Sequence, residues 1–110
     1  MNYNTFAHIG DSVPCQAVWL DSNHKPLDVQ NVTATLFNYV GDVKTIIDGP
    51  QNMIATDQAH RFLYRFEISE NVLGQTIYVA FEAELVADNS MVYGEMSIYV
   101  SDKDTFLKVV

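Results

Sequence analysis

The side chains best suited to hold a metal ion are few and widely spaced. The three histidines, His8, His24 and His60, and the single cysteine, Cys15, never stand two or four positions apart. Compact metal sites favour such short spacings, because two ligands can then reach one ion from the same stretch of chain. We therefore predict structural or surface roles for these residues and no bound metal.

One turn-forming segment has a partial likeness to a calcium-binding loop. Asp21-Ser22-Asn23 offers side-chain oxygens at its start, as such loops do. Lys25, however, occupies the position where a third oxygen ligand belongs, and no glycine follows it. We predict no calcium at this segment.

No residue has the surroundings that a catalytic nucleophile needs. Cys15 lies on the predicted inward face of a strand beside Ala17 and Trp19, where a thiol packs in the core and is not activated. Gly10-Asp11-Ser12 lacks the flanking pattern of a nucleophile elbow, and no phosphate-binding or dinucleotide-binding glycine motif occurs. We expect no catalytic residue and no cofactor, and we predict that the protein is not an enzyme.

Acidic residues offer one further catalytic interpretation. Glu82 and Glu84 share the outer side of a predicted strand, and Glu67 and Glu70 precede them in the chain. Pairs of carboxylates hydrolyse glycosidic bonds in many enzymes. Charged strand faces are more commonly found because they remain in water and discourage aggregation, and we favour that interpretation.

The best indication of function is a set of outward-facing aromatic side chains. They alternate with the predicted core residues of their strands and are Tyr3, Phe37, Tyr39, Tyr78, Tyr93 and Tyr99. Exposed aromatics are typical of protein interfaces and of platforms on which sugar rings stack. Aromatics near the edge of a sheet also pack within the fold itself. The sequence leaves both interpretations open.

Composition excludes several classes of partner. The chain has 110 residues and a net charge of -8, from 14 acidic and 6 basic residues. Such a field repels phosphate groups and anionic lipid heads, and the six basic residues are scattered along the chain. We therefore expect no nucleic-acid partner and no membrane partner.

The cysteine count and the first residues bear on location. A single cysteine cannot form an intramolecular disulfide, which fits a reducing compartment or a bacterial or viral origin. Residues 1–5 lack the basic and apolar regions of a secretory signal, and no apolar run is long enough to span a bilayer. We expect the protein to be made in a cytoplasm without a classical export signal.

The elements that must position these side chains are strands. Alternation with period two, broken by turn residues, predicts many short antiparallel strands. In the first half we expect strands at residues 12–20, 32–37 and 43–47 and a short one at 52–56. We expect turns at Asp21–Asp28, Gly41-Asp42 and Asp48-Gly49-Pro50.

The second half contains the clearest strands. We expect them at residues 62–68, 77–85 and 91–100, with the first two forming the core and a hairpin turn at Ala87–Ser90. About seven strands with turns at short intervals predict an all-β antiparallel sandwich in one domain, residues 1–110. Residues 101–110 form a tail that ends apolar, and we expect it to dock on a partner through Phe106, Leu107, Val109 and Val110.

Several segments resemble bacterial and macroglobulin-type immunoglobulin-like domains. Gly10–Val13, Asp21–Asp28 and Val32–Leu36 are similar to the opening of those domains, and His60–Ile68 with Leu73–Tyr78 is similar to a later strand pair. The likeness covers residues 9–100 and implies an immunoglobulin-like β-sandwich. The sequence departs from the pattern at His60, where glycine is common, and in a longer spacing from Gly74 to Tyr78.

Small stand-alone domains that end in a strand like Tyr93–Val100 are similar to proteins encoded among the head and tail genes of tailed bacteriophages. The resemblance implies a structural virion protein, located at the neck, tail or capsid surface, whose partners are other virion proteins and copies of itself. A carbohydrate- or receptor-binding module is the alternative, since exposed tyrosines stack on sugars. An accessory domain of a bacterial enzyme complex is a third possibility.

Overall fold

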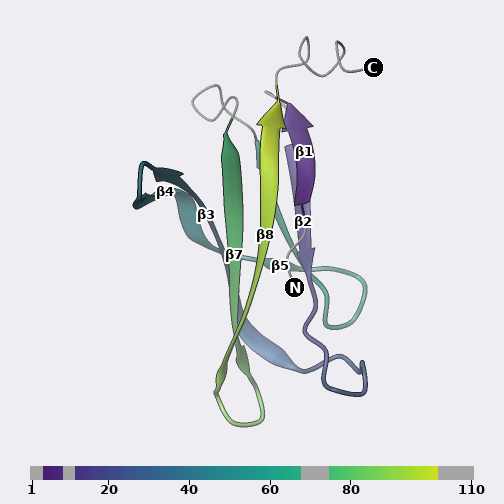
Figure 1. Ribbon diagram of the computed structural model, residues 1–110. Coiled ribbons are helices and arrows are strands. Elements are labelled where there is room, and N and C mark those ends of the chain that lie inside the picture. Colours follow the sequence, from purple (N-terminus) through teal and green to yellow (C-terminus); the bar gives the residue numbers. More distant parts are fainter. Residues whose placement is uncertain (1–3, 9–11, 68–74, 102–110) are drawn as a thin grey trace.

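A computed structural model of the chain describes residues 4–8, 12–67 and 75–101. All regular structure in these residues is β-strand (Figure 1). The strands are β1 (Asn4–His8), β2 (Ser12–Ala17), β3 (Val29–Val40), β4 (Val43–Asn52), β5 (Ile54–Ala55), β6 (Phe62–Glu67), β7 (Thr76–Leu85) and β8 (Met91–Ser101).

The strands form two sheets. One has five strands in the order β1-β8-β7-β3-β4, and the other has three in the order β2-β6-β5. Their inner faces share one core, so the predicted all-β sandwich of about seven strands is confirmed. Neighbouring strands are antiparallel with one exception, because β1 pairs parallel to β8. The sequence did not predict β1 as a strand.

The core consists of side chains that alternate along the central strands. Ile77, Val79 and Ala83 of β7 and Ile98 and Val100 of β8 have no exposed surface. From the facing sheet, the inward side chains of β2 and β6 pack against them as predicted, and the β3 side chains complete the cluster. The inward residues of β2, β3 and β6 are Cys15, Val32, Ala34, Leu36, Tyr64 and Phe66.

The strand β4 differs most from the prediction. We expected it to stop at Asp48-Gly49-Pro50, but it continues through a cis Gly49–Pro50 peptide bond to Asn52. The pairing of β4 with β3 is irregular in this region, with register shifts on both sides of Leu36. The predicted short strand at 52–56 is reduced to Ile54–Ala55, and the strand expected to reach Leu20 ends at Ala17.

The chain reversal predicted at Asp21–Asp28 is present. Oδ1 of Asp21 accepts hydrogen bonds from the backbone N–H groups of Asn23 (2.8 Å) and Lys25 (3.0 Å). A bridge between Leu20 and Pro26 closes the turn. Because its carboxylate oxygen already holds the turn together, Asp21 has a structural role of the kind that Asx turns provide.

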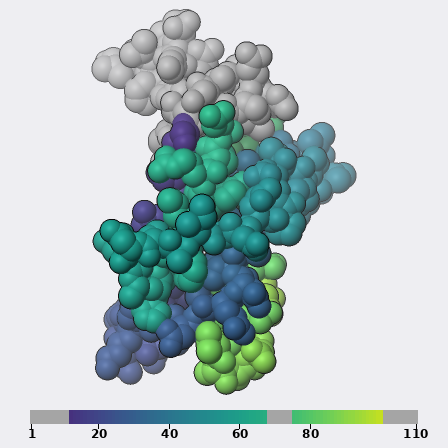
Figure 2. Space-filling view, turned by 180° about the vertical axis from the view of Figure 1, so that it is seen from behind, coloured from purple at the N-terminus to yellow at the C-terminus, as the bar shows by residue number. Residues whose placement is uncertain are grey.

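The β3–β4 hairpin projects from the side of the molecule (Figure 2). Its tip is Gly41-Asp42, as the sequence predicted, and Gly41 adopts a left-handed conformation (φ +64°). Beyond the reach of the three-stranded sheet, both sides of this hairpin meet solvent, since residues 39–47 are all exposed. The hairpin therefore presents surface that the core does not cover.

Candidate functional site: the outer face of the five-stranded sheet

The register of the sheet brings the predicted outward aromatics onto one surface. Phe37 pairs with Tyr78, Glu82 pairs with Tyr93, and Thr76 pairs with Tyr99. Paired residues share a face, and each of these alternates with the buried residues of its own strand. All five described aromatics of the set, Phe37, Tyr39, Tyr78, Tyr93 and Tyr99, therefore lie on the outer face of this sheet.

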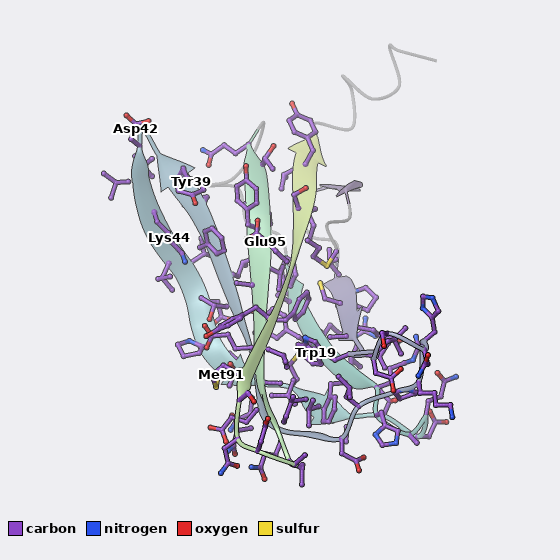
Figure 3. All side chains as sticks on the ribbon, turned by 60° about the horizontal axis from the view of Figure 1, so that its bottom comes forward. Trp19, Tyr39, Asp42, Lys44, Met91 and Glu95 are labelled. Atoms are coloured by element: carbon purple, nitrogen blue, oxygen red, sulfur yellow. The ribbon has the colours of Figure 1, made fainter. Side chains whose placement is uncertain are left out.

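Three of these rings form a cluster beside the β3–β4 hairpin. Phe37 stacks on Tyr78 with ring centroids 5.4 Å apart, and Tyr39 contacts both rings edge-on at 5.8 and 5.6 Å. The ammonium group of Lys44 lies 4.3 Å from the Phe37 centroid, in a cation–π contact. Tyr39 and Lys44 lie near each other at the hairpin in Figure 3.

Phe37 differs from the expectation of an exposed aromatic. It faces outward as predicted, but it is only 2% exposed because Tyr78, Tyr39 and Lys44 cover it. Tyr39 is 50% exposed and Tyr93 is 66% exposed. On this face Phe37 therefore packs within the fold, whereas Tyr39 and Tyr93 present their rings to solvent.

The rest of the face has small side chains at its centre and two carboxylates. Thr35 and Ala80 pair across β3 and β7, and Ala80 pairs in turn with Glu95 of β8. Glu82 is the next outward residue of β7, and both glutamates are exposed. Met91, at the start of β8, lies away from the hairpin (Figure 3). Among the described residues, no further element covers this face.

Apolar side chains on the hairpin extend the exposed surface. Val40, Val43, Ile46 and Ile47 are between 38% and 66% exposed. Ile46 pairs with Phe37 and so belongs to the outer face, next to the aromatic cluster. Sequence reasoning missed this feature, although the run Val43–Ile47 carries apolar residues on both of its faces. An edge strand of this kind is open to contact with another chain.

A separate groove of about 530 Å³ lies at the open side of the sandwich. We call it the Trp19 groove. It runs between the chain that follows β2 and the first half of β8, and the Trp19 indole N–H donates to the Tyr93 carbonyl at 3.2 Å. Its lining is Gln16, Ala17, Val18, Trp19, Leu20, Arg61, Phe81, Tyr93, Gly94, Glu95 and Met96.

Two of the side chains that could have served in catalysis have structural surroundings, since one is buried and the other is held by hydrogen bonds. Cys15 is 1% exposed, and burial raises the pKa of its thiol to about 12. Glu82 and Glu84 share the outer side of β7 as predicted, but Glu84 accepts hydrogen bonds from the amides of Gln30 (3.4 Å) and Asn31 (3.3 Å). These contacts give Glu84 a structural role.

One histidine forms a pair with a carboxylate, but this pair is not part of a larger group of metal-binding side chains in the described residues. Nδ1 of His60 lies 2.9 Å from Oδ1 of Asp28, a pair that ties two loops together. Within the described ranges, no three metal-binding side chains gather at one place. The same part of the chain contains no helix long and apolar enough to cross a membrane.

Five of the predicted interface residues lie outside the described residues. They are Tyr3 near the N-terminus and Phe106, Leu107, Val109 and Val110 in the tail. Comparison of the chain with protein-family models, with curated proteins and with solved structures finds no match.

Proposed function

We propose that this chain is a structural protein that acts by protein–protein assembly. The observation that carries the proposal is the outer face of the five-stranded sheet, where Tyr39, Tyr93 and Ile46 expose between 50% and 66% of their surface. Contiguous apolar and aromatic surface on a folded domain marks an interaction site, because leaving it in water is unfavourable. Aromatic residues are also the commonest anchors of protein interfaces.

The finer proposal is a virion component of a tailed bacteriophage, at the neck, tail or capsid surface. It rests on the resemblance of the sequence to immunoglobulin-like domains of that setting. The strand order supports the part of this resemblance that concerns the fold. Sheets ordered β2-β6-β5 and β4-β3-β7-β8 correspond to the B-E-D and C′-C-F-G sheets of immunoglobulin domains, with β1 added beside β8.

Copies of the same chain are the partner that the charges of the face favour. Lys44 lies at the hairpin end, whereas Glu95 lies beside Ala80 at the centre and Glu82 lies further from the hairpin. A two-fold axis between the hairpin end and Glu82 would set Lys44 of one copy toward Glu82 of the other, in a self-complementary interface. Complementary charge of this kind fixes orientation and speeds association.

Light scattering coupled to size-exclusion chromatography tests self-assembly. We expect a mass that rises with protein concentration and falls when salt is added, because the charge pairs are screened. Tyr39→Ser and Tyr93→Ser should each weaken the association. Ile54→Ser is the matched control, since Ile54 is 70% exposed but lies on the other sheet. A monomer at every concentration, or equal effects of all three variants, contradicts assembly through this face.

The virion location needs its own experiment. Electron microscopy of phage particles from the source lysate, labelled with an antibody against this protein, should show label at one fixed place. The antibody must first be shown to detect the protein in denatured virions. Intact particles without label would then remove the virion proposal while leaving self-assembly to stand or fall separately.

Carbohydrate binding is the second candidate function. The half-exposed ring of Tyr39, braced edge-on by Phe37 and Tyr78, offers the flat aromatic surface on which sugars stack. A glycan array would show binding that Tyr39→Ser abolishes and Tyr39→Phe retains. Assembly without any glycan signal favours the first proposal, and glycan binding by a monomer favours the second.

A further inference from the structure

The strand β4 forms one edge of the five-stranded sheet, and among the described strands none lies beyond it. Its first half, residues 43–47, is exposed throughout on the projecting hairpin (Figure 2). Val43 is 66% exposed, Ile46 51% and Ile47 38%. We call this stretch the β4 edge. An exposed apolar edge is a template on which another strand can pair.

Backbone geometry shows how the β4 edge is paired on its inner side. The N–H of Met53 donates to the carbonyl of Val32 (2.9 Å), so Val32 directs its peptide groups toward β4. Alternate residues further along β3, Asn38 among them, do the same. Asn38 pairs with Thr45, and these two residues therefore exchange hydrogen bonds within the hairpin.

Lys44 and Ile46, on either side of Thr45, direct their peptide groups the other way, to the side where the sheet ends. Two N–H groups and two carbonyls of the β4 edge thus have no partner in the described part of the chain. The ammonium group of Lys44 lies over the Phe37 ring at 4.3 Å, on the outer face of the sheet. The charge is held on that face, so it leaves the backbone of the edge open.

We propose that a second copy of this chain pairs antiparallel with the β4 edge, about a two-fold axis at Thr45. In this register Thr45 lies opposite Thr45 of the second copy, and Lys44 lies opposite Ile46 of the second copy. Lys44 and Ile46 both direct their peptide groups outward, so each such pair exchanges two hydrogen bonds. The five-stranded sheets of the two copies then form one continuous sheet.

The neighbouring registers are less favourable. An axis at Lys44 sets two lysines directly opposite each other, where like charges repel. An axis at Ile46 requires the peptide groups of Asp48, but Asp48 pairs with Leu36, which lies two residues before Asn38 and so faces β4. The peptide groups of Asp48 are therefore engaged with β3. The axis at Thr45 is the register that avoids both conflicts.

The side chains around this axis complement one another. Two threonines meet at the axis on the inner side of the sheet, a favourable cross-strand pair. Val43 comes next to Ile47 of the second copy, so that exposed aliphatic groups cover each other. On the outer face, Ile46 lies beside the aliphatic stem of Lys44 of the second copy. A patch that fits its own copy in this way is what a two-fold interface requires.

The size of the patch sets the strength of the association. Pairing of residues 43–47 buries less than the roughly 1,200 Å² of stable complexes, so we expect a weak dimer that forms reversibly. The inference shares with the proposed function the premise that copies of the chain associate. It needs neither Tyr93 nor the acidic residues of the outer face, so the two interfaces can be tested separately.

Engineered cysteines test the register directly. In Thr45→Cys the two thiols belong to a non-hydrogen-bonded pair with Cα atoms about 4.5 Å apart, within the range that a disulfide bridges. Under mild oxidation we expect a disulfide-linked dimer. Lys44→Cys is the matched control, because the two copies of residue 44 are diagonal neighbours about 7–8 Å apart. Cys15 does not interfere, since it is buried.

The outcomes separate the β4 edge from the outer face. A folded Thr45→Cys variant that stays monomeric, or equal crosslinking of the two variants, overturns the proposal. Thr45→Cys with Tyr93→Ser should crosslink as fast as Thr45→Cys alone, whatever Tyr93→Ser does to assembly through the outer face. Loss of the crosslink in that double variant means that the outer face brings the copies together, and contradicts pairing at the edge.

Proline tests the backbone pairing itself. Ile46→Pro removes an outward N–H that β3 does not use, and proline is tolerated at such positions of edge strands. Combined with Thr45→Cys, it should slow crosslinking by about tenfold, the contribution of one hydrogen bond. Ile46→Val keeps the N–H and should leave the rate unchanged. If circular dichroism shows the proline variant folded and it crosslinks as fast as the valine variant, backbone pairing at this edge is refuted.

Discussion

The hydrogen bond between Tyr64 and Asp48 joins the two sheets and provides a quantitative test of the fold. Tyr64 of β6 is 5% exposed, and its hydroxyl donates to Oδ2 of Asp48 on β4 at 2.5 Å. Burial first, and then the Asp48 carboxylate, raise the pKa of Tyr64 above the ordinary tyrosine value. The hydroxyl therefore stays protonated and remains a donor at neutral pH.

We expect Tyr64→Phe to lower the free energy of unfolding by about 2 kcal/mol. A hydrogen bond to a charged group contributes about 1.5–3 kcal/mol. Asp48 keeps a second bond, from the amide of Gln51 to Oδ1 (3.1 Å), so the loss should not exceed the middle of that range. For a domain of this size such a change lowers Tm by about 10 °C.

Urea and thermal unfolding, followed by circular dichroism and Trp19 fluorescence, measure the difference. Tyr39→Phe is the matched control. The Tyr39 ring is half-exposed and its hydroxyl makes no hydrogen bond to the described residues, so the change should alter stability by less than about 0.5 kcal/mol. The raised pKa of Tyr64 also sets the pH range in which its hydrogen bond stabilises the fold. The stabilisation by Tyr64 is fully present below the unfolded tyrosine pKa of about 10 and is lost as pH rises above it. Equal stabilities of Tyr64→Phe and the wild type at pH 7 would refute the inter-sheet bond.

Two further predictions concern Cys15 and the two glycines Gly41, at the β3–β4 turn, and Gly49, in β4. Because burial raises the pKa of Cys15 from 9.0 to about 12, its thiol stabilises the fold below pH 9 and loses that contribution as pH rises toward 12, by about 4 kcal/mol at most. Urea unfolding at pH 8 and pH 11 should show a steeper loss in the wild type than in Cys15→Ala, and parallel losses contradict the argument. Gly49→Ala should destabilise by about 3 kcal/mol, because Gly49 has φ +104° and an added Cβ would lie 2.7 Å from the Ala34 carbonyl oxygen. Gly41→Ala should lower stability by only about 1 kcal/mol, since its φ is +64° with nothing within 4 Å, and equal thermal shifts for the two variants would count against this explanation.

The sequence predicted the strands whose side chains alternate most regularly. In β7, Ile77, Val79 and Ala83 alternate with Tyr78 and Glu82, and period two has only one structural explanation when it persists over a whole strand. The inward face of β8 and the turn at Asp21 follow from equally local signals. The polarity pattern of a strand and the residues that form a turn are properties of neighbouring positions in the chain. Both can therefore be predicted without knowing the fold.

Local sequence patterns could not predict the irregular or parallel pairing of strands. Asp48-Gly49-Pro50 has the composition of a turn, yet β4 continues through it because β3 offers it a partner and two register shifts accommodate the bend. The parallel strand β1 is five residues long and carries no strong alternation. Its existence depends on the exposed edge of β8, which is distant in sequence.

The candidate site also combines features that local patterns predict with features that depend on long-range contacts. By itself the sequence determined that a set of aromatic residues alternates with the core and therefore faces outward, because the strand period is two. Only the tertiary structure decided that β3, β7 and β8 lie in one sheet, that Phe37 is covered by Tyr78 and Lys44, and that Tyr39 and Tyr93 remain exposed. The physical reason is that strand order and register are set by contacts between segments far apart in the chain, whereas alternation is set by each strand alone.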